Sequence, residues 1–157
     1  MRRTTVLMTV LALVLFAAAP AGAVEAGERI ARAELSGRNE VPPVQTGATG
    51  QARFNLSEES IEYRLFVHNI ENVTQAHIHL GSADENGPVV AFLFGFVDGG
   101  VTVDGLLATG TITADDLIGP LEGEPLSALI EAIQSGNAYV NVHTVANPPG
   151  EIRGQIR

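Results

Sequence analysis

Cysteine, tryptophan and lysine are all absent from this chain of 157 residues. Without cysteine the chain can form no disulfide, so in an oxidising compartment its fold must be held by apolar burial and backbone pairing alone. The sequence also lacks a thiol nucleophile, a G-x-S-x-G motif and a serine well placed beside a histidine. No pair of carboxylates stands out for acid and base chemistry. Nucleophilic and acid–base catalysis therefore find no support, and we expect a protein that is not an enzyme.

A second long apolar run is absent as well, and the one that exists lies at the N-terminus. It occupies positions 6–19, follows two arginines and precedes small residues at positions 21–23. This order is typical of a secretory signal peptide, and the run is shorter than the roughly 20 residues that cross a bilayer. We expect residues 1–23 to be a signal peptide and residues 24–157 to form one domain. That domain would be secreted to the periplasm or the extracellular space, with no membrane span.

Positive charge is scarce in this sequence. It contains 9 basic residues against 18 acidic ones, which gives a formal net charge of −9 at pH 7. Removing residues 1–23, which contain two arginines and no acid, takes this charge to −11. Such an acidic chain repels the phosphates of nucleic acids and the headgroups of anionic lipids. We expect neither nucleic acid nor a membrane surface as a partner.

Period-two alternation of apolar and polar residues dominates from Ile30 onward, punctuated by glycine, proline and asparagine. This pattern predicts short antiparallel strands in an all-β, Greek-key sandwich or barrel. Residues 50–57 and 60–70 should pair as a hairpin across an acidic turn. The apolar run at 89–97 indicates a strand buried on both faces or a change of sheet. Residues 98–105 indicate a turn-rich excursion.

One or two short helices should interrupt the strands late in the chain. Thr113, followed three residues later by Asp116, resembles a capping box and predicts a short helical turn. The segment 124–136 predicts a longer helix between a proline and a glycine. Two final strands follow at 138–144 and 150–156. The apolar face of the longer helix would consist of Leu126, Leu129, Ile130 and Ile133.

Two histidines lie two residues apart in the segment AHIHLG, residues 76–81. They share one face of an extended strand because successive side chains point to opposite sides. Ile78 and the apolar residues of the last two predicted strands should point into the core. The polar residues that alternate with them on these three strands would then point away from the core on one common face. Solvated faces usually carry lysine, glutamate, threonine and serine, so this composition is unusual. We call these residues the polar row: His77, His79, Tyr139, Asn141, His143, Glu151 and Arg153.

The polar row admits two interpretations. Imidazole is the commonest protein ligand for transition metals, so the three histidines together could form a metal site. Histidines also pair readily with carboxylates, amides and carbonyls, so the other members could satisfy the rings in a structural network. The structural network is the simpler expectation, since H-x-H pairs are common in strands. The candidate metal ligands are His77, His79 and His143, and the candidate partner-binding residues are Tyr139, Asn141, Glu151 and Arg153.

Two other polar features carry weaker signals. His68 stands alone at the end of a predicted strand, and we expect no functional role for it. The segment SADENGP offers Asp84, Glu85 and Asn86 as oxygen donors, but it lacks the ordered ligand spacing of a calcium loop. We expect this segment to be a solvated turn.

Five segments carry a family resemblance: LSGRNEVPPVQTGATGQARF, AHIHLGSADENGPVVAFL, GTITADDL, GNAYVNVHT and NPPGEIRGQI. In order and spacing they resemble the CHRD domain, a module named after the signalling antagonist chordin, from about Leu35 to the C-terminus. The resemblance implies an extracellular all-β module without established catalytic activity or cofactor. Such a module would act in binding or in surface assembly, with an extracellular protein or glycan as its partner.

A second resemblance concerns the histidines. An H-x-H strand followed by glycine, a later strand ending in histidine and a final arginine-containing strand occur in the same order in copper-zinc superoxide dismutases. This likeness implies a superoxide-dismutase-like fold, with an immunoglobulin-like one as the alternative. It also implies that His77, His79 and His143 are copper ligands and that Arg153 lies beside the metal. The chain lacks the bridging histidine, the zinc loop and the cysteines of those enzymes.

Two functional hypotheses follow. The first is a secreted, non-enzymatic module that acts in binding or assembly. The alternative is a periplasmic or extracellular copper-binding protein that uses the three histidines. A bound metal should leave as the imidazoles become protonated near their ordinary pKa of about 6.5.

Overall fold

The computed structural model describes residues 29–157, so the predicted signal peptide and the first residues of the predicted domain lie outside the described residues. Within them, no helix combines the length and the apolar character needed to cross a bilayer. This part of the chain contains eight strands, one α-helix and three short 3-10 helices. The strands are β1 (Arg29–Ser36), β2 (Thr49–Leu56), β3 (Ile61–His68), β4 (Val73–Leu80), β5 (Val89–Phe94), β6 (Gly105–Ile112), β7 (Ala138–Thr144) and β8 (Ile152–Gln155). The helices are η1 (Gly37–Asn39), η2 (Ala114–Asp116), η3 (Gly119–Leu121) and α1 (Leu126–Gln134).

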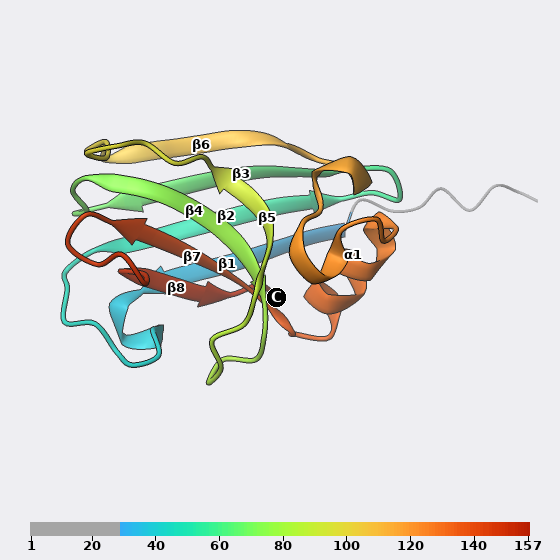
Figure 1. The fold of residues 1–157 in the computed structure, drawn as a ribbon, viewed down its shortest axis with the longest axis horizontal. Helices are drawn as coiled ribbons and strands as arrows, with labels where there is room; N and C mark the ends of the chain where they lie inside the picture. Colours follow the sequence, from blue (N-terminus) through green and yellow to red (C-terminus); the bar gives the residue numbers. More distant parts are fainter. Residues whose placement is uncertain (1–28) are drawn as a thin grey trace, which may run out of the picture.

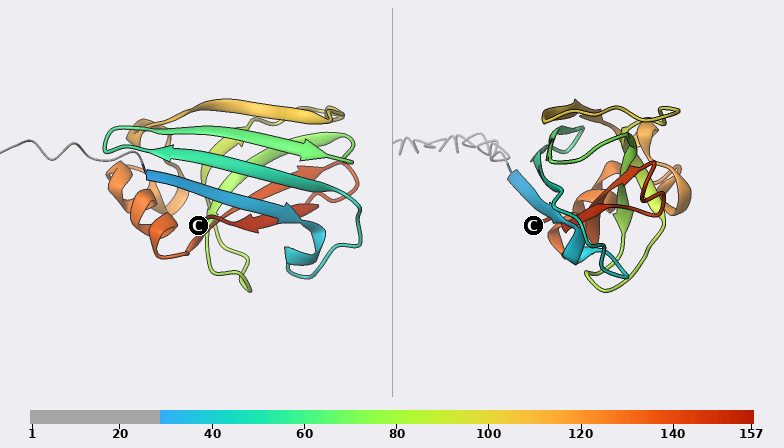
Figure 2. Two further views of the ribbon diagram at one scale, coloured as in Figure 1. Left: turned by 180° about the vertical axis from the view of Figure 1, so that it is seen from behind. Right: turned by 90° about the vertical axis from the view of Figure 1, so that its left-hand side faces the viewer.

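The strands form one curled, nearly closed sheet. Neighbouring strands pair antiparallel in the order β5-β4-β7-β8-β1-β2-β3-β6. The two ends of the sheet approach each other, and the Tyr63 hydroxyl of β3 donates a 2.8 Å hydrogen bond to the Leu93 carbonyl of β5 (Figure 1 and Figure 2). Because β6 returns to pair with β3 and β7 returns to pair with β4, the connections are of the Greek-key type. The predictions of an all-β Greek-key fold and of the β2–β3 hairpin are confirmed.

Alternation along each strand separates the barrel interior from its outside. In β1, Ala31, Ala33 and Leu35 are buried, whereas Arg32 and Glu34 are exposed. Burying a valine, leucine, isoleucine or phenylalanine side chain stabilises the fold by about 1.5–3 kcal/mol. The interior residues of the strands therefore provide the main stabilising contribution, and they hold the barrel wall on which the polar row lies.

The helical predictions are also confirmed. The backbone N–H and hydroxyl of Thr113 both donate to the Asp116 carboxylate at 2.8 Å, which gives the capping box at η2. α1 lies at one end of the barrel, where its apolar face joins the core (Figure 1). That face consists of the four predicted residues, Leu126, Leu129, Ile130 and Ile133, all of which are buried.

Two details of the predicted strands are wrong. β6 was not expected, because it contains two glycines, alternates weakly and pairs only with β3, through a bulge at Leu65 and Phe66. β5 is not buried on both faces: Phe92 is 48% exposed, and Phe96 just beyond the strand is 68% exposed. Phe92 is paired with His77 in the register and so lies on the outer face of the sheet.

Candidate metal centre

The polar row lies on the outer side of the barrel wall, where β4, β7 and β8 are neighbours. The register places His77 opposite Asn141, and Asn141 opposite Arg153, so the prediction that they share one face is confirmed. This outward face is covered, because the exposed fractions of the polar row are only 1–9%. Three connections fold over it and hydrogen-bond to it or to each other: residues 37–48, 81–88 and 145–151.

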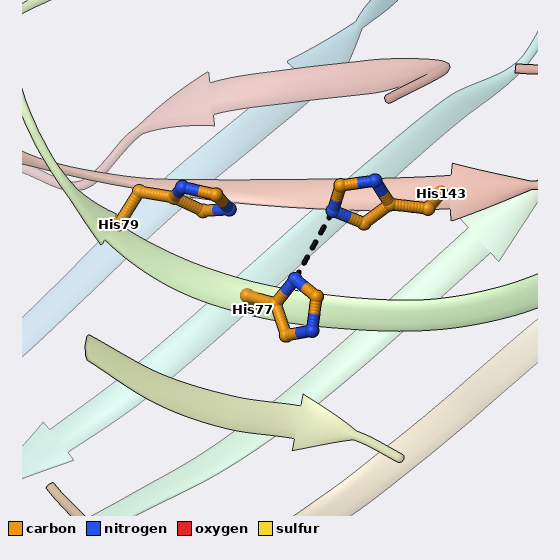
Figure 3. A group of neighbouring side chains, drawn as sticks. All are labelled: His77, His79 and His143. Carbon is orange, nitrogen blue, oxygen red and sulfur yellow. Dashed lines mark hydrogen bonds between the residues drawn. The ribbon is translucent and has the colours of Figure 1, made fainter. Parts of the chain in front are cut away.

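The three histidines converge at the centre of this covered face (Figure 3). Nδ1 of His77 lies 3.1 Å from Nε2 of His143. The His79 ring centroid lies 5.7 Å from that of His77 and 6.2 Å from that of His143. One nitrogen from each ring can be chosen so that all three lie within 4.8 Å of one another. The arrangement therefore gathers three nitrogen donors in one small volume.

Backbone carbonyls set the protonation of two of these rings. His79 Nδ1 donates to the Gly87 carbonyl at 2.9 Å, and His143 Nδ1 donates to the Pro148 carbonyl at 2.8 Å. Since a carbonyl can only accept, each Nδ1 carries the proton and each Nε2 keeps its lone pair. The contact between His77 and His143 then requires the proton to be on Nδ1 of His77. Within residues 29–157, Nε2 of His77 and Nε2 of His79 are buried and have no hydrogen-bond partner.

Burial keeps these imidazoles neutral. Burial, together with the neighbouring His143 and His79, lowers the pKa of His77 to about 3. Burial also lowers the pKa of His79 and of His143, against the opposing effect of the hydrogen bond that each ring makes to a carbonyl. A metal ion binds only the deprotonated ring nitrogen. At neutral pH the cluster therefore presents lone pairs rather than positive charge.

The structural network considered from the sequence does not form around the rings. Within the described chain, Glu151, Asn141 and Arg153 make no hydrogen bond to any of the three imidazoles, whose bonds go to carbonyls and to each other. Glu151 instead accepts from the hydroxyls of Thr46 and Thr144, each at 2.7 Å, and from the Asn147 amide at 3.1 Å. Its carboxylate thus ties two connections together beside the site.

Arg153 holds the third connection over the site. Its guanidinium donates to the carbonyls of Ser82 at 2.7 Å and Glu85 at 2.5 Å, and to the Asn86 side-chain oxygen at 3.1 Å. These oxygens point at a cation that the protein itself supplies. Residues 82–86 are exposed, as expected for a solvated turn, while their backbone anchors Arg153.

Tyr139 lies between Arg153 and the histidines. The Arg153 guanidinium carbon lies 3.5 Å from the centroid of the Tyr139 ring. On the other side of Tyr139, the His79 ring is stacked at 4.8 Å with an interplanar angle of 12°. A cation over an aromatic face is attracted by the ring quadrupole. The stack therefore fixes the plane of His79 from behind.

Glu40 is a buried residue of this region that sequence reasoning missed. Its carboxylate accepts a 2.7 Å hydrogen bond from the Asn141 amide. Burial raises the pKa of Glu40 to about 7, although Arg153 and Asn141 both oppose the change. A side chain at Gly150 would place its Cβ 2.4 Å from the Asn141 amide nitrogen, so glycine is needed there. Glu40 lies in a proline-rich connector 101 residues before Asn141, and no local pattern marks it.

His68 lies apart from the cluster. Its ring nitrogen pairs with the carboxylate of Asp104, and both side chains are more than half exposed. This agrees with the expectation that His68 has no role in the site.

The sequence was compared with known proteins. A family model described as the CHRD domain matches residues 31–156. Chordin from Xenopus laevis is 31% identical to the chain over 132 residues, which cover 78% of the chain and 12% of chordin. The chain thus spans about an eighth of the length of that relative. No solved structure matches the chain.

Glu40→Gln should change how stability depends on pH. The folded protein holds the Glu40 proton with a pKa of about 7 instead of 4.5, so wild-type stability falls as the pH rises between these values. The slope is about 1.4 kcal/mol per pH unit. The free energy of unfolding is measured by urea denaturation of metal-free protein. As the pH rises over this interval, we expect the stability of Glu40→Gln to increase by about 3 kcal/mol relative to that of wild type. A difference independent of pH would contradict this role.

Proposed function

The chain belongs to the CHRD domain family, and from this premise and the geometry of its histidines we propose that it binds one copper ion through His77, His79 and His143. The observation that supports the proposal is the convergence of three buried, neutral imidazoles, two of them oriented by backbone carbonyls. Metal-ligating histidines commonly donate their second ring nitrogen to such a carbonyl, which fixes the tautomer that binds.

The nitrogen set fits one ion. The atoms that face one another are Nδ1 of His77, Nε2 of His79 and Nε2 of His143 (Figure 3). The two Nε2 atoms present lone pairs, whereas His77 has to move its proton from Nδ1 to its unpartnered Nε2 before Nδ1 can bind an ion. Nε2 of His79 is buried without a hydrogen-bond partner among residues 29–157, which costs about 1–3 kcal/mol unless something binds it. Two nitrogens at about 2.1 Å from one ion lie at most about 4.2 Å apart. The three nitrogens, which lie within 4.8 Å of one another, would need to draw together by at least about half an ångström.

The donor type favours copper. The described residues place three imidazoles but no carboxylate in the cluster, and the chain has no cysteine, so hard cations such as calcium and magnesium are disfavoured. Imidazole suits copper, zinc, iron and nickel, and among divalent ions of this series copper binds most strongly. When bound, copper would supply a Lewis-acidic centre that can change its oxidation state by one electron.

The surrounding side chains orient and shield the ligands. The stack of Arg153 on Tyr139 limits rotation of His79. On the opposite side, the edge of the His77 ring meets Phe92 of β5 with their centroids 4.5 Å apart. Phe92 is the residue of β5 opposite His77 in the register and is about half exposed, so it stands between His77 and solvent.

Calorimetric titration of metal-free protein with copper(II) tests this proposal. We expect one ion per chain with a dissociation constant below about 1 μM. His77→Ala and His143→Ala should each weaken binding by at least about tenfold, because a metal–ligand bond is lost. His68→Ala is the matched control and should bind like wild type. Absence of binding by the intact protein, binding insensitive to both cluster variants, or tighter binding of zinc would refute the proposal.

The same titration at falling pH gives a second readout. Because burial lowers the pKa of all three histidines, protons compete for the ring nitrogens only at lower pH than in an exposed cluster. Copper should therefore remain bound below pH 6.5, contrary to the expectation from the sequence alone. Release centred at or above about pH 6.5 would mean that the rings titrate as free imidazoles.

We also propose that the protein is a secreted module that acts in binding or assembly rather than in catalysis. The support is its family membership and the fact that a much longer relative contains a matching segment. The polar row is buried, so a macromolecular partner would have to bind elsewhere.

Export can be tested by expressing the full chain in its own host and determining the N-terminus of the exported protein by mass spectrometry. A periplasmic or extracellular protein beginning after Ala23 is the expected result. Retention of the intact N-terminus inside the cell would contradict it.

A further inference from the structure

Four arginines form a continuous row on the outer face of the barrel. Arg32, Arg53 and Arg64 lie directly opposite one another on β1, β2 and β3. Arg157 extends the row, because it exchanges backbone hydrogen bonds of 2.7 and 2.8 Å with Arg32. Residues paired in this way project to the same side of a sheet. The left view of Figure 2 looks onto β1, β2 and β3. We call these four residues the arginine row.

This arrangement opposes the ordinary chemistry of a sheet. Like charges directly opposite each other on neighbouring strands destabilise the pairing. The chain has a net charge of −9, yet four of the seven arginines in residues 29–157 lie in this row. Local violations of this kind are expected where a site has a function. A compensating anion would relieve the repulsion.

The protein itself provides little compensation. Among residues 29–157, no carboxylate lies within 4.0 Å of a nitrogen of these arginines. Glu34 and Glu62 lie on the same face, but Glu34 is hydrogen-bonded by the Gln51 amide at 2.6 Å. Arg53 donates to the other side of that amide at 2.9 Å. The four side chains are exposed, so their charges are available to a ligand in solution.

The shape of the surface suits an extended ligand. Neighbouring strands lie about 4.8 Å apart, so three strands and the segment of Arg157 spread the row over roughly 14 Å. A groove of about 500 Å³ runs beside Arg32, Arg53 and Arg64. Asn55, Thr109 and Thr111 also line it and offer amide and hydroxyl groups to a polar ligand. Glu62 lines the groove too, so the groove combines three cations with one carboxylate and several neutral hydrogen-bonding groups.

We propose that the arginine row binds a linear acidic polysaccharide with a carboxylate on successive sugars. The planar guanidinium forms paired hydrogen bonds with a carboxylate, and its positive charge strengthens them. The amide and hydroxyl groups of the groove match sugar hydroxyls. This surface differs from the histidine cluster, so the proposal stands whether or not copper binds.

A single-stranded nucleic acid fits this surface less well. Such ligands depend on aromatic side chains that stack with the bases. Two aromatic residues line the groove, and neither offers an open ring: Phe54 is 1% exposed, and Tyr63 is partly buried with its hydroxyl donating inward to the Leu93 carbonyl.

Binding of the purified full chain to oligogalacturonate of defined length, measured by calorimetry, tests the proposal. The double variant Arg53→Gln/Arg64→Gln should bind at least about tenfold more weakly, because two charge-assisted contacts are lost. Both side chains are exposed, so the variant should keep the circular dichroism spectrum and melting temperature of wild type. The matched control, Arg29→Gln/Arg38→Gln, removes the same charge outside the row and should bind like wild type. Added salt should weaken wild-type binding.

Three further probes decide the chemistry of the ligand. Neutral dextran should not bind, and heparin and a single-stranded oligonucleotide should bind more weakly than oligogalacturonate. Tighter binding of heparin would assign the row to sulfates instead of carboxylates, and tighter binding of the oligonucleotide would assign it to nucleic acid. Either result would overturn the proposal, as would equal binding by wild type and Arg53→Gln/Arg64→Gln, or no binding to any probe.

Discussion

The buried guanidinium of Arg153 is the constraint on which the rest of the site depends. A buried charge must be hydrogen-bonded to be tolerated, and Arg153 meets this requirement through two carbonyls and the Asn86 side chain of the connection that follows β4. It thereby holds that connection over the polar row. The same connection presents the Gly87 carbonyl to His79, while the stack on Tyr139 fixes the His79 ring. Arg153 therefore keeps this connection over the histidine cluster and also fixes the orientation of His79.

Coverage by loops divides the barrel wall into two chemically different surfaces. Over β4, β7 and β8, the connections exclude water, and burial keeps the histidines neutral with their lone pairs free. Over β1, β2 and β3 the arginines are exposed and keep their charge in water. The same antiparallel pairing produces both surfaces: it aligns His77 with Asn141 and Arg32 with Arg53. The proposed metal site and the proposed polysaccharide surface thus follow from one sheet.

Much of this arrangement was predictable because side-chain alternation is a local property. Alternation along the strands predicted that His77, His79 and Arg153 share one face, and the spacing of apolar residues predicted the helix α1. Burial of that face was not predictable, since it depends on connections that are distant in sequence, as the contact between Glu40 and Asn141 illustrates. The arginine row needs the register of three strands and the pairing of Arg157 with Arg32, which no single segment encodes. β6 was missed because a weakly alternating, glycine-containing strand resembles a loop.

The claim that the fold holds three buried, neutral imidazoles in set tautomers is tested most directly by nitrogen-15 NMR of the histidine side chains in metal-free protein. At pH 7 the account predicts that His77, His79 and His143 all appear as neutral rings protonated on Nδ1. Charged rings, or averaged Nδ1 and Nε2 signals, at the three cluster positions would contradict it.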